Sequence, residues 1–482
     1  MLNGMAGAPD RQTLVRAAAE RAAGDFDHWR GLNRYFHDED ARYLRFLIRP
    51  GLRVLELGCG RGDLLARLEP AHGIGIDFSP GMIAAARRRY PDLDFRLGDI
   101  EDAEVIRALG AVPFDIILLS DTIGSLDDIQ QTIERLHPLC GPDTRLVVSC
   151  YSPLWEPIVR VAEALKWKMP TLMQNWLSCG DIAALLELAD FQEIKREWRM
   201  LVPKRLLGLG VLVNRFLAPL PGLRRLAVRN YLVLRSRRAP TPPIGSVSVI
   251  IPCRNERGNI EPAIRRMPRI APDQELIFVE GHSTDGTLDE IRRVMAANPD
   301  LDIKLAVQPG KGKGDAVRCG FDLARGDVLM ILDADLTMPP EDLPKYFAAL
   351  ASGKGEFING SRLVYPLEVQ AMRFLNLLAN RAFALIFTYL LDQRITDTLC
   401  GTKALSARHY RQLAAGRAYF GDFDPFGDFD LIFGAAKLNL TFIEIPVRYR
   451  ARRYGKTQIS RFRHGWRLLR MVVFAWRRLK SI

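Results

Sequence analysis

Apolar residues in the first half of the chain follow two periods in turn. Short apolar runs alternate with longer segments whose apolar residues recur at helical spacing. The runs lie at residues 54–57, 74–76, 95–97, 116–119 and 146–149. Strands that alternate with helices predict a parallel, doubly wound sheet. Residues 11–50 show only the helical spacing, so we expect helices there that form a lid before the first strand.

The same alternation begins again after a proline-rich stretch at residues 238–245, which is typical of a linker. The new apolar runs lie at residues 247–251, 276–279, 303–307 and 328–332. A second α/β domain is therefore predicted. We expect four parts, which are a first domain at 1–203, a basic amphipathic connector with its linker at 204–245, a second domain at 246–462 and a basic amphipathic helix at 463–482.

The composition fits two folded domains. Apolar residues make up 48% of the 482 residues and charged residues 26%, which is ordinary for globular proteins and excludes gross disorder. A chain of this length usually forms two or three domains. The seven cysteines are scattered and never form a Cys-x-x-Cys pair, so we expect neither a disulfide framework nor a zinc site.

The net charge of +12 is concentrated in two segments. Residues 199–238 contain ten Lys or Arg, residues 448–480 contain twelve, and neither segment contains an acid. Apolar and aromatic residues stand between these cations, which favours an anionic membrane surface over nucleic acid as the partner. The sequence shows no signal peptide and no apolar stretch that could span a bilayer. We therefore expect a cytoplasmic protein, held peripherally on the cytoplasmic face of the membrane.

A glycine-rich turn at residues 56–62 joins the first strand to the next helix. Glycines let the backbone turn tightly there and approach a ligand. Asp77 ends the second strand at the distance where an acid can reach a ribose hydroxyl. Asp63 stands where a dinucleotide fingerprint has glycine, and residues 98–100 (Gly-Asp-Ile) follow the third strand. Over roughly residues 40–200 these motifs resemble the class I S-adenosylmethionine-dependent methyltransferases.

This resemblance implies a Rossmann-like fold with S-adenosyl-L-methionine as cofactor. It assigns Glu56, Gly58 and Gly60 to the methionine part, Asp77 to the ribose, Asp99 and Ile100 to the adenine, and Asp121 and Thr122 to the methyl group. Methyl transfer needs mainly alignment and a nucleophile with a lone pair. His37, Asp121 or His137 could act as a base, and the identity of the methyl acceptor stays open.

Two carboxylates, Asp333 and Asp335, follow the apolar run that ends at Leu332. Such a pair can bind Mg²⁺ or Mn²⁺ through oxygen, and the ion can neutralise a departing diphosphate. Three more motifs accompany the pair, at residues 250–256, 279–287 and 310–314. Over about residues 247–465 the set resembles the family 2 glycosyltransferases of GT-A fold, in particular those that load polyprenyl phosphate with one sugar.

This second resemblance implies a nucleotide-sugar site with a divalent metal. It assigns Pro252, Glu256 and Glu280 to the base and ribose, Lys311 or Lys313 to the diphosphate, and Asp333 and Asp335 to the metal. The family usually has two acids before Gly-Ser in its second motif, whereas this chain has Glu280-Gly-His282. The choice between uracil and guanine therefore stays open.

Later motifs of the family present cations to the acceptor. Arg362 and Lys403 match two of them, and Arg452 matches an arginine landmark, although Gln458 replaces a usual lysine. Asp430 falls on a late acidic position. A phosphate acceptor is already an ionised nucleophile, so Asp430 would then mainly organise the site, whereas a hydroxyl acceptor would need it as a base.

Amphipathic segments accompany the second domain. A helix is predicted from Arg463 onward, with an apolar face separate from its arginines. The apolar face comprises Trp466, Leu469, Val473 and Trp476, and the basic face comprises Arg463, Arg467, Arg470 and Arg477. Such a helix suits anionic headgroups, and the alternative is a helix packed on the sheet with solvated arginines. We expect a helical hairpin at 370–392, and residues 204–233 either meet the membrane or pack between the domains.

Together the two resemblances imply a bifunctional transferase with two α/β domains. We expect one domain to move a hexose from a UDP- or GDP-linked sugar to polyprenyl phosphate at the membrane surface, and the other to be a methyltransferase. Two alternatives stay open. In the first, the sugar acceptor is a hydroxyl of a glycolipid or polysaccharide. In the second, the N-terminal domain binds its cofactor without catalysis and serves as a regulatory module.

Overall fold

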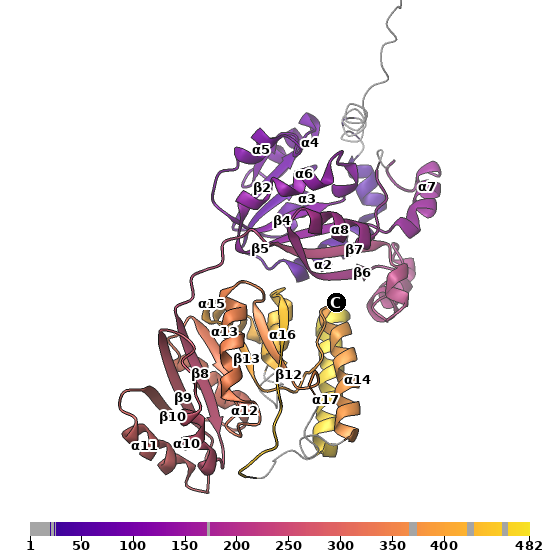
Figure 1. Cartoon of the computed structure of the whole chain (residues 1–482). Coiled ribbons are helices and arrows are strands. Elements are labelled where there is room, and N and C mark those ends of the chain that lie inside the picture. Colours follow the sequence, from indigo (N-terminus) through magenta and orange to yellow (C-terminus); the bar gives the residue numbers. More distant parts are fainter. Residues whose placement is uncertain are drawn as a thin grey trace, which may run out of the picture. The chain divides into compact units, whose positions relative to one another are not determined.

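Two folded units make up the chain. The computed structural model describes residues 20, 24, 26–170, 174–365, 374–421, 429–455 and 461–482 (Figure 1). Residues 1–240 and 481–482 belong to the first unit, and residues 241–480 belong to the second. Each unit contains one seven-stranded sheet with helices around it, so the predicted α/β class of both halves is confirmed.

The sheet of the first unit has the strand order β3-β2-β1-β4-β5-β7-β6. Its strands are β1 (Arg53–Leu57), β2 (His72–Asp77), β3 (Asp94–Leu97), β4 (Phe114–Ser120), β5 (Cys140–Tyr151), β6 (Phe191–Arg199) and β7 (Arg229–Ser236). β1 to β5 run parallel, as predicted, whereas β7 is antiparallel to both β5 and β6. The glycine turn and Asp121 follow β1 and β4, the two central strands, at their carboxyl ends.

Strand β7 corrects the predicted connector. The sequence pattern places residues 204–245 outside both domains, but residues 229–236 lie between β5 and β6 in the first sheet. Tyr231, Leu232, Val233 and Leu234 are all buried there because the strand has a neighbour on each side. The arginines around this short apolar run conceal the strand in the sequence, and one of them, Arg229, is itself fully buried.

Helices cover the first sheet. They are α2 (Arg34–Leu47), α3 (Asp63–Arg67), α4 (Pro80–Arg89), α5 (Ala103–Arg107), α6 (Ile129–Glu134), α7 (Glu156–Ala164), α8 (Cys179–Leu188) and α9 (Leu209–Leu212). The main core lies between the central strands and α6 and α8, where Ile133 and Ile182 pack against side chains such as Leu119 and Val148. Burial of these apolar side chains stabilises the frame that holds the strand ends in place.

The sheet of the second unit has the strand order β10-β9-β8-β11-β13-β12-β14. Its strands are β8 (Ser246–Cys253), β9 (Asp273–Glu280), β10 (Asp302–Val307), β11 (Val328–Ile331), β12 (Phe357–Ser361), β13 (Lys403–Ser406) and β14 (Phe442–Pro446). β13 is antiparallel to its two neighbours, and the other pairs are parallel. The aspartate pair follows the central strand β11.

The helices of the second unit are α10 (Arg257–Arg265), α11 (Thr287–Ala297), α12 (Lys313–Leu323), α13 (Leu343–Ala351), α14 (Phe374–Leu391), α15 (Ala407–Ala415), α16 (Phe429–Lys437) and α17 (Arg461–Ala475). The core lies between β8, β9 and β11 and the helices α10, α11 and α13. The described part of the predicted hairpin at 370–392 is the single helix α14. None of the helices within the described ranges is both long and apolar enough to cross a membrane.

Helix α17 packs beside α14 through a face that was not predicted (Figure 1). Leu468, Met471 and Ala475 are buried, and Leu479 extends this buried row. The predicted apolar face is different, and it is exposed, with Trp466 at 65%, Leu469 at 48% and Val473 at 53% of full exposure. The helix therefore carries two apolar faces, one of which is used in packing.

Candidate active sites

The glycine turn of the first unit has the backbone geometry that its sequence predicts. Gly58, Gly60 and Gly62 have φ angles of 77°, 51° and 73°, which favour glycine. A Cβ atom at Gly58 would lie 2.3 Å from the hydroxyl oxygen of Thr122, so a side chain there would clash with the loop after β4. Asp77 fixes the turn by accepting hydrogen bonds from the Gly60 amide at 2.8 Å and the Ser79 amide at 2.9 Å.

Glu56 is a buried carboxylate beside this turn. Its side chain accepts a hydrogen bond from the Leu65 amide at 3.1 Å, and no ion pair to it is found among the described residues. Burial raises the pKa of Glu56 to about 8, and the negative charges of Asp77 and Asp63 act in the same direction. A ligand with a positive charge would relieve this burial cost, so the site fits a cationic ligand.

A buried arginine connects the end of β4 with helix α2. Arg229 on β7 donates hydrogen bonds to Asp40 at 2.9 Å, to Ser149 at 3.1 Å and, through a further short contact, to Asp121. Asp121 has a φ angle of 57° and keeps 38% of its side chain exposed. No sequence motif points to Arg229 or Asp40, because they lie far apart in the chain and Arg229 belongs to a basic stretch.

Aromatic side chains line the same end of the sheet. Phe36 of α2 stacks on Tyr151 at the end of β5 with ring centroids 5.4 Å apart, and Arg229 lies 5.4 Å and 5.2 Å from the two rings. His37 follows Phe36, and burial lowers its pKa to about 4, so its imidazole is neutral at neutral pH. Arg229 connects the two stacked rings with the partly exposed Asp121, and together they form one wall of a candidate acceptor site.

His137 does not belong to this site. Its two ring nitrogens form hydrogen bonds with Ser236 at 2.7 Å and with the Ala189 carbonyl at 2.8 Å. Ser236 lies at the end of β7, whereas Asp121 binds Arg229 at the start of the same strand. His137 and Asp121 are therefore at opposite ends of the strands. His137 therefore has a structural role, and the suggestion that it acts as a base is wrong.

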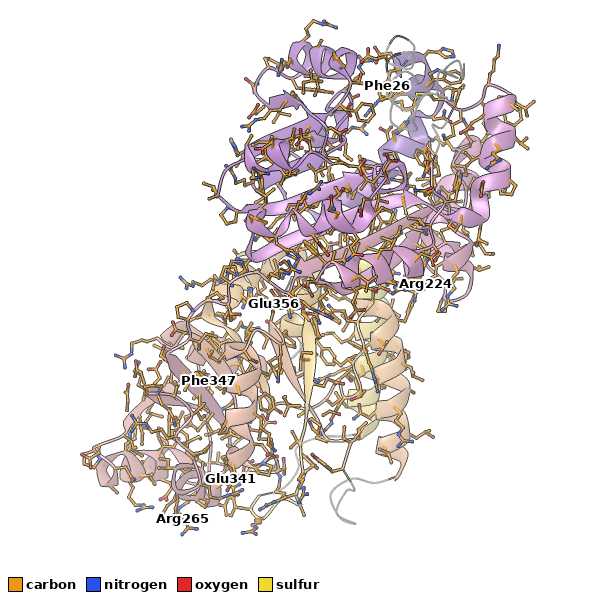
Figure 2. The ribbon with its side chains drawn as sticks, turned by 45° about the horizontal axis from the view of Figure 1, so that its top comes forward. Phe26, Arg224, Arg265, Glu341, Phe347 and Glu356 are labelled. Atoms are coloured by element: carbon orange, nitrogen blue, oxygen red, sulfur yellow. The ribbon has the colours of Figure 1, made fainter. Side chains whose placement is uncertain are left out.

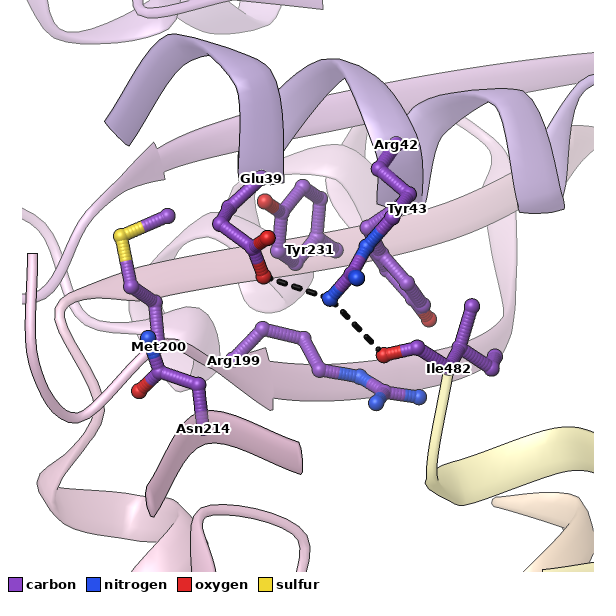
Figure 3. Close-up of a pocket in the computed structure, with 8 residues that line it drawn as sticks. All are labelled: Glu39, Arg42, Tyr43, Arg199, Met200, Asn214, Tyr231 and Ile482. Carbon is purple, nitrogen blue, oxygen red and sulfur yellow. Dashed lines mark hydrogen bonds and ion pairs between the residues drawn. The ribbon is translucent and has the colours of Figure 1, made fainter. Parts of the chain in front are cut away.

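A separate small pocket is lined by Glu39, Arg42 and Tyr43 of α2 and by Tyr231 of β7 (Figure 3). Arg42 donates hydrogen bonds there to Glu39 at 2.5 Å and to the backbone oxygen of Ile482 at 3.0 Å. Tyr231, which also lines the pocket, donates a hydrogen bond to Asp40 at 2.5 Å. The pocket contains none of the predicted site residues. Its charged side chains already have partners, because Arg42 pairs with Glu39 and Arg199 pairs with Glu197 at 2.7 Å.

The aspartate pair of the second unit is held by two cations. The ammonium group of Lys313, at the start of α12, lies 2.7 Å from Asp333, and the guanidinium of Arg452 lies 2.7 Å from Asp335. Burial alone would raise the pKa of Asp333, but Lys313 and the charges of Lys403 and Arg362 lower it. Thr337 also donates to Asp335 through its amide at 3.1 Å and its hydroxyl at 2.8 Å.

Arg452 bridges two predicted parts of the nucleotide site. One guanidinium nitrogen donates to Asp335, and another donates to Glu256 at 2.6 Å. The segment that carries it is bound along the site by the amide of Arg450, which donates to the Thr337 carbonyl at 2.9 Å. Tyr454 packs on Gly258, where a Cβ atom would lie 2.4 Å from its ring. The segment at 447–455 therefore crosses the edge of the sheet where Glu256 and Asp335 meet.

The backbone at Gly401 lies close to the ion pair between Lys313 and Asp333. A Cβ atom at Gly401 would lie 2.0 Å from an Asp333 carboxylate oxygen and 2.3 Å from the Lys313 nitrogen. Only glycine leaves room for the ion pair at this position. Of the two alternative lysines, Lys313 is the one beside Asp333, whereas Lys311 is exposed on the preceding loop.

Comparison with known proteins separates the chain into the same two halves. Residues 248–412 match the family model of glycosyl transferase family 2, and residues 55–146 match that of a methyltransferase domain. The chain joins a methyltransferase domain to a family 2 glycosyltransferase domain. Both resemblances predicted from the motifs are thereby confirmed.

Curated relatives match the glycosyltransferase domain. A dolichol-phosphate mannosyltransferase of Saccharomyces cerevisiae is 38% identical over 109 residues, which are 21% of this chain and 40% of the relative. One from Pyrococcus furiosus is 34% identical over 142 residues, or 29% of this chain and 40% of the relative. A polyprenol monophosphomannose synthase of Mycolicibacterium smegmatis is 28% identical over 228 residues, or 46% and 84%. The chain thus spans about two fifths of the length of the first two.

The predicted acceptor cations of the glycosyltransferase domain are engaged in internal contacts. Arg362 forms a bidentate pair with the buried Asp397 at 2.6 Å and 2.8 Å. Lys403 is fully buried and donates to the Cys400 carbonyl at 2.5 Å. Asp430 at the start of α16 lies 3.8 Å from Arg318 and 3.7 Å from Arg417. Their roles toward an acceptor stay predictions.

The remaining predicted residues lie at the expected strand ends. Glu280 is buried and accepts hydrogen bonds from the amides of His282 at 3.1 Å and Ser283 at 2.6 Å, so it shapes its own loop. Pro252 lies near the end of β8. In the methyltransferase domain, Asp99 accepts from the Glu101 amide at 2.9 Å, and Ile100 is buried. Gln458 and the side chain of Arg463 lie outside the described residues.

Proposed function

We propose that the glycosyltransferase domain moves a hexose from a nucleotide sugar to polyprenyl phosphate by direct displacement at the anomeric carbon. The observation that carries the proposal is the aspartate pair after β11, which is faced by cations from two distant segments. Such a centre suits the departure of a diphosphate, because carboxylates and cations can both exchange their internal contacts for the ligand. The curated relatives are polyprenyl- and dolichol-phosphate enzymes, which supports this acceptor class.

Asp333 and Asp335 would hold a divalent ion. Their carboxylate oxygens are ligands that Mg²⁺ and Mn²⁺ prefer, and because residue 401 is glycine, no side chain at that position covers the Asp333 carboxylate. When bound, the ion supplies charge neutralisation for the departing diphosphate. Lys313 would add to this neutralisation by exchanging Asp333 for a phosphate oxygen, since its ammonium is a mobile point charge. Pro252, Glu256 and Glu280 would line the base and ribose.

A phosphate acceptor would need cations more than a base. Arg362, Lys403 and Arg452 are the candidates, and Arg452 is the one that can be released most simply, because it is bound through half-buried contacts. Asp430 lies between Arg318 and Arg417, which supports an organising role. The alternative is a hydroxyl acceptor on a glycolipid or polysaccharide, which would need Asp430 as a base.

The methyltransferase domain would use S-adenosyl-L-methionine. The positive φ angles of the turn and the buried Glu56 support this cofactor, since the methionine part carries cationic groups that the carboxylate can receive. Asp77 would bind the ribose, Asp99 and Ile100 would border the adenine, and Asp121 would face the methyl group. The cofactor supplies an electrophilic methyl carbon on its sulfonium sulfur.

The glycosyltransferase domain would meet its acceptor at a membrane, held peripherally on the cytoplasmic face. Exposed apolar side chains lie on α17, and its neighbour α14 carries Leu378 and Leu385, which are 57% and 74% exposed. Arg467 and Arg470 of α17 and Arg477 just after it are exposed as well. Apolar side chains flanked by arginines suit an anionic bilayer surface.

One assay tests the proposal for the glycosyltransferase domain. The full chain is incubated with a panel of nucleotide sugars, Mn²⁺ and polyprenyl phosphate, and organic-extractable glycolipid is measured. We expect one donor to give a lipid product that disappears in Asp335→Ala. Asp289→Ala serves as the control, because Asp289 lies on the same domain with 84% of its side chain exposed. A lipid product from none of the donors would contradict the proposed acceptor.

A further inference from the structure

The methyltransferase domain has its own exposed apolar surface. On α7 and the residues that flank it, Leu154, Ile158, Val161 and Leu165 follow the spacing of one helical face and are 52–62% exposed, and Trp167 is 60% exposed. A helix inside a water-soluble protein normally turns such a face to the core. Here Val159 is the buried residue of the helix, and the apolar stripe faces outward.

A second segment, residues 204–226, shows the same property. Leu209, Leu212 and Phe216 are 60%, 57% and 46% exposed, and Leu220 and Leu223, beyond the turn that ends this helical stretch, are 37% and 41% exposed. The segment turns at Leu206 and Leu207, which both have left-handed φ angles, 44° and 56°. Leu207 is 109% exposed, so the turn at residues 206–207 has a strained backbone and carries a leucine whose side chain is fully open to solvent.

The two segments are joined at both ends. Near the start of α7, the Trp155 indole donates to the Leu226 carbonyl at 2.8 Å. At the other end, Asn33 donates to the Trp167 carbonyl at 3.1 Å and accepts from Lys204 at 2.9 Å. Both segments lie on the same flank of this unit (Figure 1, and Arg224 of the second segment in Figure 2). We call the exposed residues of 154–167 and 204–226 the apolar flank.

The charge on the apolar flank indicates which kind of surface it fits. Residues 204–226 contain Arg205, Arg215 and Arg225 at exposed positions and contain no acid. On α7 the acids Glu156 and Glu163 are paired with Arg160 and Lys168. Exposed leucines beside arginines match the boundary of an anionic bilayer, where apolar side chains enter the acyl region and the cations meet headgroups.

The apolar flank and the wall of the candidate methyl-acceptor site share one small buried cluster. Phe36, Met200 and Val228 form a small buried cluster, against which Tyr151 and Trp155 pack. Phe36 and Tyr151 are the stacked rings beside Arg229 and Asp121. Trp155 leads into α7, and residues 200 and 228 stand at the two ends of the second segment. A molecule that reaches Asp121 along these rings would therefore start from the apolar flank.

We propose that the methyltransferase domain docks on an anionic membrane through the apolar flank and methylates an acceptor that is held in that membrane. The inference rests on the proposed methyltransferase activity. A nucleophilic oxygen or nitrogen of the acceptor forms the new bond to the methyl carbon, and the carbon–sulfur bond breaks with its electron pair left on sulfur. Any proton released from the nucleophile passes to the Asp121 carboxylate.

A probe at the tip of the flank tests docking in the full chain. Leu207→Cys carries an environment-sensitive fluorophore in a Cys319→Ala background, because the other six cysteines are buried. We expect a blue shift with vesicles of phosphatidylcholine and phosphatidylglycerol and none with phosphatidylcholine alone. Leu188→Cys is the matched control, since Leu188 is 65% exposed at the end of α8, near the start of β6, whereas the flank lies near the other end of that strand. A probe at residue 207 that shows no shift would overturn the docking.

Methyl labelling tests the acceptor. The full chain receives cofactor with a labelled methyl group together with membranes, and label is measured in the organic and aqueous phases. We expect organic-phase label that falls roughly tenfold in Ile158→Asp/Leu207→Asp, with unchanged cofactor binding, and that is unchanged in Leu188→Asp. Label only in the aqueous phase, with no effect of the double variant, would overturn the membrane acceptor alone. Absence of cofactor binding or of any label would instead contradict the methyltransferase activity itself.

Discussion

The two domains hold their ligand-facing carboxylates in opposite ways. Glu56 of the methyltransferase domain is buried without an ion pair among the described residues, and burial raises its pKa to about 8. Asp333 and Asp335 of the glycosyltransferase domain are each paired with a cation. The first site therefore suits a ligand that brings positive charge, whereas at the second site the proposed metal ion would have to displace the cations that already pair with the carboxylates.

Replacing the buried arginine beside the first site should have the largest effect. Arg229→Met would leave Asp40 and its neighbours without their cation, which should cost about 3–5 kcal/mol of the free energy of unfolding. Hydrogen exchange of β5 and β7 in increasing urea measures this loss. Arg107→Met, at an arginine with 69% of its side chain exposed, should change stability by less than about 0.5 kcal/mol.

Substitution of each of the two alternative lysines tests which of them acts on the diphosphate. Lys313→Ala should lower kcat/KM for the nucleotide sugar by about a hundredfold, since the lysine pairs with Asp333 at the proposed metal site and would contact the diphosphate. Lys311→Ala, on the same loop but exposed, should lower it by less than about threefold. Equal losses in the two variants would show that the pairing with Asp333 has no part in donor binding.

The raised pKa of Glu56 makes both the stability of the methyltransferase domain and its cofactor binding depend on pH. The pKa of Glu56 is raised from a usual 4.5 to about 8, so the folded, ligand-free domain takes up a proton, and its stability should fall as pH rises between these values. A cationic cofactor favours the ionised carboxylate, so binding at pH 7 should release a proton from Glu56. Calorimetry in buffers of different ionisation enthalpy measures this release.

Glu56→Gln removes this titration. It should weaken cofactor binding by roughly tenfold and remove the Glu56 part of the proton release, while the ligand-free domain becomes more stable above pH 8. Asp99→Asn is a suitable comparison, because it changes a carboxyl at the adenine end and should leave the proton release unchanged. Loss of stability in Glu56→Gln at high pH would contradict the view that this carboxylate is held at a cost.

Asp430 should give the smallest change. For a phosphate acceptor, Asp430→Asn should lower glycosyl transfer by less than about tenfold, because the nucleophile is already ionised and the side chain mainly holds Arg318 and Arg417. The transfer rate with saturating donor measures this. A loss of about a thousandfold or more would favour a hydroxyl acceptor that needs a base.

Local motifs in the sequence predicted much of both domains. The glycine turn and the aspartate pair are contiguous, so their positions at the ends of β1 and β11 follow from the strand pattern alone. Contacts between distant segments could not be read in this way. Arg229 meets Asp40 and Asp121 across 189 and 108 residues, and Arg452 meets Glu256 across 196.

Strand β7 and helix α17 show a second limit of prediction from the sequence. The apolar run of β7 is short and lies among arginines, so its charge pattern resembles that of a surface segment more than that of an inner strand. In α17 two faces are apolar, and spacing alone cannot decide which of them packs. The structure buries Leu468 and Met471 and exposes Trp466 and Leu469.

Arg452 makes the two ends of the proposed nucleotide-sugar site interdependent. Because one guanidinium is shared between Glu256 and Asp335, a ligand that takes either carboxylate changes the free energy with which the other is held. Thermodynamic reciprocity then requires that the metal alters donor affinity by the same factor as the donor alters metal affinity. A single side chain thus provides a path for heterotropic cooperativity within one domain.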